Sequence, residues 1–314
     1  MKKLSRSLGA LIVGGAIVAP VVPLSLSAQQ SAYAAACPAW GAVQTGAAIA
    51  EPSINEASGL VASGDHPGVL WMIEDSLNPA ILWAINTQGQ TVGKFTLSGA
   101  INFDWEDISI DRLPGTDEVY VPDIGDNKNI RDGTTAKRPL PTIYRLPEPV
   151  VSASGPEVIA TVPVEAFPIR YADESGNLLP PRNAESYMVD PITHDSFIVE
   201  KVAHVVSGKN EYWVSRLPAS LTPGVVNLAT RISSVIAGKP LAADISPDGQ
   251  WIMIKGGGGL IWPRTGTVEQ TLDAAPSAPC KAKVGPGESL AQAPDGLWTT
   301  PDGASPSLYR TPPA

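Results

Sequence analysis

A short acidic phrase recurs along the chain, and each copy places a carboxylate at the start of a short apolar run. Most copies are soon followed by a turn of the Pro-Asp-Gly type. The carboxylates are those of Glu56, Glu106, Glu185, Asp244 and Glu288. Self-similar units along a chain indicate a repeat architecture. Because a charge at the mouth of a buried strand is costly, its repetition predicts one place where these side chains converge.

The segments between these carboxylates have the composition of strands and turns. The chain contains 31 Pro and 29 Gly, spread along its length. Between them lie short runs rich in Val, Ile, Trp and Tyr, which is typical of strands joined by turns. Apolar residues at three- and four-residue spacing, which would predict helices, are nearly absent after the N-terminal segment. We therefore expect an all-β fold.

The predicted strands group into units that each begin at one of the carboxylates. The first four units have strands near 69–74, 81–86 and 91–97; near 118–122, 142–146 and 157–163; near 196–201, 211–216 and 227–236; and near 250–255, 259–263 and 267–272. The last unit has strands near 296–299 and 306–310 and lacks one, which residues 42–50 could supply. This pattern predicts a β-propeller of about five blades, closed by the N-terminal strand. A β-sandwich is the alternative.

The N-terminal segment has the features of a signal peptide, which we assign to residues 1–36. Lys2, Lys3 and Arg6 precede an apolar stretch, and Ala32-Tyr33-Ala34 offers a cleavage site. A retained anchor helix and a lipid-modified Cys37 are the alternatives. We expect a secreted or cell-envelope protein whose residues 37–314 form a single domain.

Export makes a disulfide bond between Cys37 and Cys280 plausible, since these are the only cysteines. The formal net charge is −9. Removal of residues 1–36 takes away three basic residues and no acidic ones, so the charge falls to −12. Such a charge repels nucleic acid and favours cations. We expect no nucleic-acid partner, no membrane span, and a monomer.

The recurring carboxylates predict a metal site if each of them starts an inner strand of a propeller. Glu56, Glu106, Glu185, Asp244 and Glu288 would then surround one mouth of the central channel. Their mutual repulsion would be relieved by a hard cation, and calcium prefers several carboxylate and carbonyl oxygens. With three His residues and two Cys, softer metals are disfavoured. The alternative is that each carboxylate accepts backbone hydrogen bonds from the next repeat.

A second candidate site follows a predicted strand, in a segment rich in oxygen-bearing side chains. The expected ligand-binding residues are Asp107, Asp123, Asp126, Asn127 and Arg131. Asp-Asn-Gly clusters also form ordinary turns. The polar stretches 123–141 and 170–182 are expected on one face, as a rim or lid.

Enzymatic activity is the alternative to simple binding of a small ligand or a cell-envelope component. The chain has no G-x-S-x-G elbow, no H-E-x-x-H motif and no phosphate loop; Gly256–Gly259 reads as a hairpin turn. Paired carboxylates can still act as acid and base, and Glu106 and Glu185 are the expected pair. The reaction would be hydrolysis of a phosphate ester, a nucleotide or a glycoside, with or without calcium.

Several motifs resemble a family of exported actinobacterial β-propeller proteins with no assigned reaction. They are Glu56-Ala-Ser-Gly-Leu, Asp104-Trp-Glu-Asp-Ile108, Asp123-Ile-Gly-Asp-Asn127, Ile143-Tyr-Arg-Leu-Pro-Glu-Pro149, Asn183-Ala-Glu185 and Asp244-Ile-Ser-Pro-Asp-Gly249. The chain is also similar to calcium-activated nucleotidases (apyrases), which are propellers with an acidic residue near the start of each inner strand and a calcium ion in the channel. This second resemblance implies calcium at Glu56, Glu106, Glu185 and Glu288, with Asp244 departing from the family's usual serine.

Overall fold

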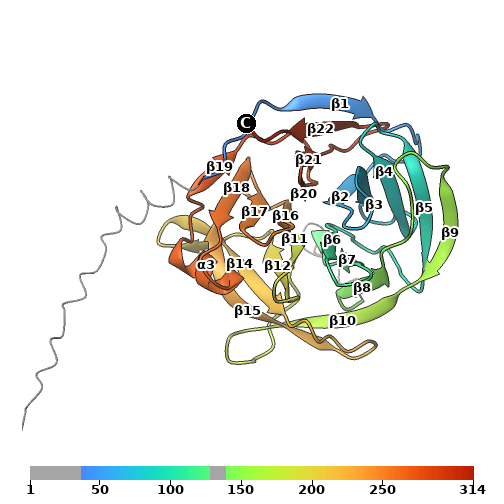
Figure 1. Ribbon diagram of the computed structural model, residues 1–314. Helices are drawn as coiled ribbons and strands as arrows, with labels where there is room; N and C mark the ends of the chain where they lie inside the picture. The colour runs from blue at the N-terminus through green and yellow to red at the C-terminus, as the bar shows by residue number, and fades with distance from the viewer. Residues whose placement is uncertain (1–36, 128–138) are drawn as a thin grey trace, which may run out of the picture.

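The computed structural model describes residues 37–127 and 139–314, in which β-strands are arranged around a central axis (Figure 1). The predicted signal peptide, residues 1–36, and the candidate ligand residue Arg131 lie outside the described residues. The described part of the chain contains no helix with the length and hydropathy of a membrane span. The expectation of an all-β fold is confirmed, with one short helix as the exception described below.

The strands form four hydrogen-bonded sheets. The first contains β2 (Ala57–Ala62), β3 (Val69–Glu74), β4 (Ile81–Asn86), β5 (Thr91–Ser98) and β9 (Val158–Pro163). The second contains β6 (Ser109–Asp111), β7 (Glu118–Asp123), β8 (Thr142–Pro147), β10 (Glu165–Ala172), β15 (Asn227–Ile236), β14 (Lys209–Leu217), β12 (Ser196–Glu200) and β11 (Ala184–Val189), with β13 (His204–Val206) beside β14. The third contains β16 (Ala242–Ile245), β17 (Trp251–Lys255), β18 (Gly259–Pro263) and β19 (Cys280–Ala282). The fourth contains β20 (Ala291–Ala293), β21 (Gly296–Thr299), β22 (Ser307–Thr311) and β1 (Gln44–Ala48).

The inner strands β2, β6, β11, β16 and β20 surround the axis (Figure 1). Each of them contacts the next in this order, and β20 contacts β2, so the ring closes. From each inner strand, antiparallel strands lead outward. The second sheet counts nine strands because the parallel pair β10 and β15 joins two such outward runs.

The two ends of the described chain close the ring together. β1 pairs antiparallel with β22, as expected for residues 42–50. The predicted disulfide bond between Cys37 and Cys280 is present and links residues 243 positions apart. It fixes the start of the described chain to β19. Pairing the ends in this way leaves fewer exposed strand edges.

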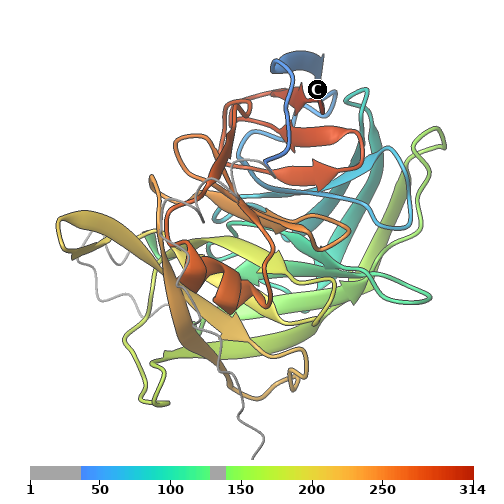
Figure 2. The ribbon, with the colours of Figure 1, turned by 60° about the vertical axis from the view of Figure 1, so that its left-hand side comes forward.

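Two sequence predictions about outer strands are wrong. Residues 267–272 were expected to form a strand, but Val268–Ala274 is the helix α3. Thr267 caps it, and Gln270 completes a capping box, a signal that outweighs the short apolar run. Figure 2 shows α3 lying against β15, which it contacts. The strand near 157–163, β9, does not complete the second unit; it pairs with β5, and β10 takes the expected place beside β8.

The core lies between neighbouring sheets and is filled by large side chains. Trp71, Trp83, Trp105 and Trp262 are fully buried. Trp71 meets Phe95 edge to face, with ring centroids 5.8 Å apart. Large aromatic side chains dominate the burial energy of such cores.

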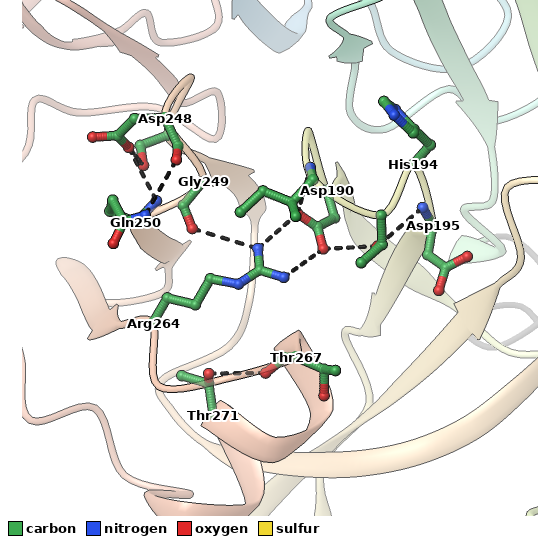
Figure 3. A network of polar contacts seen from close by, with 12 residues as sticks. Asp190, His194, Asp195, Asp248, Gly249, Gln250, Arg264, Thr267 and Thr271 are labelled. Atoms are coloured by element: carbon green, nitrogen blue, oxygen red, sulfur yellow. Dashed lines mark hydrogen bonds and ion pairs between the residues drawn. The ribbon is translucent and has the colours of Figure 1, made fainter.

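A buried ion pair connects two sheets at the end of the ring opposite the sequence-predicted carboxylates. Arg264, which follows β18, donates two hydrogen bonds of 2.6 and 2.7 Å to Asp190 in the β11–β12 turn (Figure 3). Thr193 donates a third, at 2.8 Å. Burial opposes ionisation of Asp190, but these hydrogen bonds outweigh it and hold the pKa below its usual value. The pair ties the two sheets together as long as Asp190 is ionised.

Candidate metal centre

Five carboxylates meet at one end of the ring and form what we call the central carboxylate cluster. Its members are Asp75, Asp104, Glu106, Glu185 and Glu288. They form two groups, Asp75–Asp104–Glu106 and Glu106–Glu185–Glu288, and in each group one oxygen per residue lies within 4.8 Å of the others. Glu106 belongs to both groups. The structure therefore brings together three of the five carboxylates that the repeated phrase singled out.

The positions of these residues follow from the ends of the strands. Glu185 is the second residue of β11, whereas Glu106 and Glu288 lie three residues before β6 and β20. Asp75 directly follows β3. Because β3 is antiparallel to the inner strand β2, it ends at the side of the ring where β2 begins. The cluster therefore joins residues far apart in the chain through the meeting of strand ends on one side of the ring.

Burial and repulsion oppose ionisation in the cluster. Glu106 is 2 % exposed, and its pKa is raised well above the usual value by burial, with Asp75 and Asp104 adding repulsion. The pKa of Asp75 is raised to about 6, mainly by burial and also by Asp104, Glu288 and Glu56, against a backbone hydrogen bond from Ser76 that lowers it. Like charges held this close destabilise the folded protein unless protons or a cation compensate them.

Lys201, which directly follows β12, provides part of that compensation. Its Nζ forms an ion pair with Glu185 and donates a 3.4 Å hydrogen bond to Asn127 Oδ1. The Glu185 side chain is 1 % exposed, so this ion pair provides a partner for a carboxylate that has little access to water. Burial lowers the pKa of Lys201, and Glu106 and Glu288 act in the opposite direction. The Lys201 ammonium group thus compensates negative charge on the Glu185 side of the cluster.

The loop after β7 covers the Asp104 and Glu106 side. Asn127 donates its backbone N–H to Asp104 at 3.1 Å and its side-chain amide to Glu106 at 3.4 Å. Asp123 accepts the backbone N–H groups of Phe103 and Asp104, both at 3.1 Å. A Cβ atom at Gly125 would collide with the carboxylates of Asp104 and Glu106, so only glycine allows this loop to lie so close.

Asp126 and Asp107, which were also predicted as ligand residues, lie outside the central carboxylate cluster. Asp126 is buried, and its backbone N–H donates to Asn183 Oδ1 at 2.7 Å. Asp107 is fully buried and bridges two inner strands, because its Oδ2 accepts the backbone N–H groups of Tyr187 at 2.9 Å and Ala243 at 3.0 Å. Of the predicted ligand residues, Asn127 contacts carboxylates of the cluster, whereas Asp107 bonds the inner strands to each other.

Asp244 does not join the groups of carboxylates found among the described residues. Its Oδ2 accepts the backbone N–H of Gln292 at 2.7 Å, the same role toward the next inner strand that Asp107 has toward Tyr187. Asp244 is therefore equivalent to Asp107, and the residue equivalent to Glu106 in this repeat is Ala243. Because neighbouring residues of a strand point to opposite faces, a shift of one residue takes the carboxylate away from the mouth. Glu56 is also outside these groups, and its Oε2 accepts a 2.7 Å hydrogen bond from Asn78.

Sequence reasoning missed four of the charged residues in this region: Asp75, Asp104, Lys201 and Lys255. Asp75 and Lys201 each follow an apolar run that ends in a glutamate, a pattern that could have drawn attention to them. Lys255 ends β17, and its Nζ donates to the carbonyl groups of Pro286 at 3.2 Å and Ser289 at 3.1 Å. Burial lowers the pKa of Lys255 to about 8, although Glu288 raises it.

Comparisons with known proteins give distant similarities only. No family model and no curated protein matches the chain. A solved structure titled Kuenenia stuttgartiensis Hydrazine Synthase is 13% identical with a TM-score of 0.37, and the match covers 78% of this chain and 68% of that one. A carbohydrate-active enzyme of family AA12 from Trichoderma reesei is 12% identical with a TM-score of 0.41, over 88% and 98% of the two chains. A Bacteroides thetaiotaomicron protein of unknown function is 11% identical with a TM-score of 0.39, over 86% and 75%. None of these similarities supports a functional assignment.

Proposed function

We propose that the protein is a secreted, five-bladed β-propeller that binds a divalent cation, calcium, in the central carboxylate cluster. Five inner strands that contact one another in a closed ring support the blade count. The pairing of β1 with β22 supports a propeller closed by its N-terminal strand. The basic and apolar N-terminal segment and the disulfide bond support export.

One observation carries the metal proposal: Asp75, Asp104 and Glu106 place their oxygens within 4.8 Å of one another in a buried position. Lys201 pairs with Glu185, so this group is the less compensated side of the cluster. Carboxylates crowded in this way are the ligands that calcium prefers, and bound calcium would remove the repulsion that raises the pKa of Glu106. We therefore assign Asp75, Asp104 and Glu106 as the principal ligands, with Glu185 and Glu288 contributing charge.

Thermal unfolding with and without calcium tests the proposal. A ligand that binds only the folded state raises the midpoint of unfolding, so calcium added after chelation should stabilise the wild-type protein. Glu106→Gln removes the residue shared by both groups and should abolish the response. Glu157→Gln makes the same charge change at an exposed position and is the matched control. A calcium response of wild-type size in Glu106→Gln would disprove the assigned ligands.

A second function, carboxylate-based hydrolysis of a glycoside, is favoured by the asymmetry of Glu106 and Glu185. Their oxygens lie within 4.8 Å of each other. Burial raises the pKa of Glu106, as a general acid requires, whereas Glu185 faces the Lys201 ammonium group, as an ionised partner does. Carboxyl groups about 5 Å apart are typical of retaining glycosidases.

A panel of aryl glycosides and aryl phosphates, assayed with and without calcium, distinguishes the two functions. Hydrolysis that disappears in both Glu106→Gln and Glu185→Gln would establish the carboxylate mechanism. Unchanged hydrolysis in either variant would eliminate it. A calcium response without hydrolysis of any substrate in the panel would favour cation binding alone.

A further inference from the structure

A basic groove lies beside the third sheet and has no part in the functions considered so far, although Lys255 and Gly287 connect it to the Glu288 side of the central carboxylate cluster. It has a volume of about 950 Å³ and is bounded by the hairpin 256–259 between β17 and β18, by β19, and by the segment 283–287. The charged residues that line it are all basic: Lys255, Lys281 and Lys283. No carboxylate is among its lining residues, although the chain as a whole has a formal net charge of −9.

The two exposed lysines lie at the end of a strand that is held in place. Lys281 belongs to β19 and Lys283 directly follows it, and both are exposed on either side of the buried Ala282. Residues two apart in extended backbone are roughly 6–7 Å apart. Cys280 precedes them and is bonded to Cys37, while the carbonyl of Lys283 accepts a 3.0 Å hydrogen bond from Thr311. These anchors hold the backbone that carries the two lysines, and both residues line the groove.

The glycine hairpin adds backbone donors to the same groove. Gly256 donates its N–H to the carbonyl of Gly258 at 2.9 Å, but the N–H groups of Gly257 and Gly258 donate to no other described residue. Gly257 has φ +75° and Gly258 has φ +136°, while Gly256 does not have a positive φ. A change of φ sign between successive residues is the backbone pattern of an anion-binding nest. Nothing lies within 4 Å of a Cβ built at Gly257, so the tip is open.

Lys255 lies at the floor of the groove rather than at its rim. It is 4 % exposed and is held by two carbonyl groups, so it contributes positive field without a flexible side chain. Backbone N–H groups and lysine ammonium groups together suit tetrahedral oxyanions, because they offer several donors and positive charge with no acceptor. A carboxylate would use fewer of these donors.

We propose that this groove binds a phosphate-bearing ligand, with Lys281, Lys283 and the N–H groups of the glycine hairpin as its contacts. The site is separate from the central carboxylate cluster and requires no metal ion. Its spacing suits a ligand with two or more linked phosphates, each near one lysine. Free inorganic phosphate offers the same chemistry but spans only one of these positions.

Isothermal titration of the full-length exported protein with tripolyphosphate, inorganic phosphate and citrate tests the proposal. The titration is made at low ionic strength and in the presence of EDTA, so that calcium bound to the central cluster cannot bridge an anion to the protein. We expect saturable binding of tripolyphosphate, weaker binding of inorganic phosphate, and weaker binding of citrate. Tripolyphosphate affinity should fall roughly tenfold in Lys281→Gln and in Lys283→Gln, the size of one charge-assisted hydrogen bond.

Lys209→Gln, at an exposed position on β14, makes the same charge change away from the groove and should bind like the wild type. Circular dichroism of each variant confirms that the fold is kept. Absence of saturable tripolyphosphate binding, equal affinity for citrate, or equal losses in Lys209→Gln and the two groove variants would each overturn the proposal. Because EDTA is present throughout, these outcomes are independent of whether calcium binds at Glu106.

Discussion

Two acidic clusters in this molecule bring their oxygens equally close but differ in their surroundings. Each group of the central carboxylate cluster, such as Glu106–Glu185–Glu288, and a peripheral cluster, Asp65–Asp117–Glu148, has one oxygen per residue within 4.8 Å of the others. The peripheral cluster lies near the opposite ends of β2 and β6, where the first two sheets meet.

Hydrogen-bond donors explain the difference. Glu148 accepts from the Ser63 hydroxyl, the Asp65 backbone N–H and the indole of buried Trp71, and Asp117 accepts the backbone N–H of Leu113 at 2.9 Å. In the central cluster the donors are fewer: Asn127 donates to Asp104 and Glu106, and the Lys201 ammonium group pairs with Glu185. Carboxylates that accept several hydrogen bonds hold a fold together, whereas carboxylates that face each other with few donors are stabilised by a cation. Proximity alone does not distinguish the two.

Loss of a carboxylate should be most harmful in the peripheral cluster. Glu148→Gln replaces an acceptor of three hydrogen bonds by a group that is itself partly a donor, so Trp71 loses its charged partner. We expect the free energy of unfolding to fall by about 2–4 kcal/mol. Chemical denaturation in EDTA measures it, with exposed Glu157→Gln as the control, expected within about 0.5 kcal/mol of the wild type. If the free energy of unfolding falls no more in Glu148→Gln than in Glu157→Gln, the peripheral carboxylates do not hold the fold together and the proposed difference between the clusters is wrong.

Substitutions in the two clusters should also differ in their effect on stabilisation by calcium, and this difference should be nearly as large. At a calcium concentration about one hundred times the dissociation constant, binding adds about 2.7 kcal/mol to the free energy of unfolding. Asp104→Asn should lose this gain, because it removes a proposed ligand. Asp117→Asn removes a peripheral carboxylate and should keep the gain on top of a lower baseline. If Asp117→Asn lost the calcium response and Asp104→Asn kept it, calcium would bind in the peripheral cluster, and the assignment of the central ligands would be wrong.

Without calcium, a central substitution should have the opposite sign to the peripheral one. Glu106→Gln keeps an oxygen that can accept from Asn127 and removes the repulsion from Asp75 and Asp104. We expect roughly 1 kcal/mol of added stability in EDTA, or about 2–4 °C in the midpoint of thermal unfolding for a chain of this size. Differential scanning calorimetry measures it. A destabilised Glu106→Gln protein would mean that this carboxylate holds the fold together.

The dependence of stability on pH should be the smallest effect. Asp75 has a pKa of about 6 in the folded protein, above its ordinary value of 3.8. The folded state therefore binds this proton more tightly, and the stabilisation is fully present below about pH 4 and disappears as the pH rises through 6. In EDTA, this group should make the protein more stable at pH 5 than at pH 7. Thermal unfolding of wild type and Asp75→Asn should differ in this slope, and identical slopes would contradict the shift.

The repeated phrase allowed much of this to be foreseen. Because strands of one repeat superpose on the next, Glu106, Glu185 and Glu288 could be expected to meet, and so could the closure by residues 42–50. Asp244 could not be placed, since a one-residue difference in register decides whether a carboxylate reaches the mouth or bonds the next strand. Lys201 and Asp75 depend on where outer strands end, which the repeat does not specify. The helix α3 could have been found from its Thr267 and Gln270 capping box, which the expected strand at 267–272 left out of account.

Anomalous diffraction from crystals grown with calcium, with EDTA-treated crystals as the reference, tests the central claim most directly. We predict one strong peak within about 2.3–2.6 Å of oxygens from Asp75, Asp104 and Glu106, the usual calcium–oxygen distance. A peak at Asp65, Asp117 and Glu148 instead, or no peak at either cluster, would contradict the conclusion that crowded carboxylates with few hydrogen-bond donors mark the cation site of this protein.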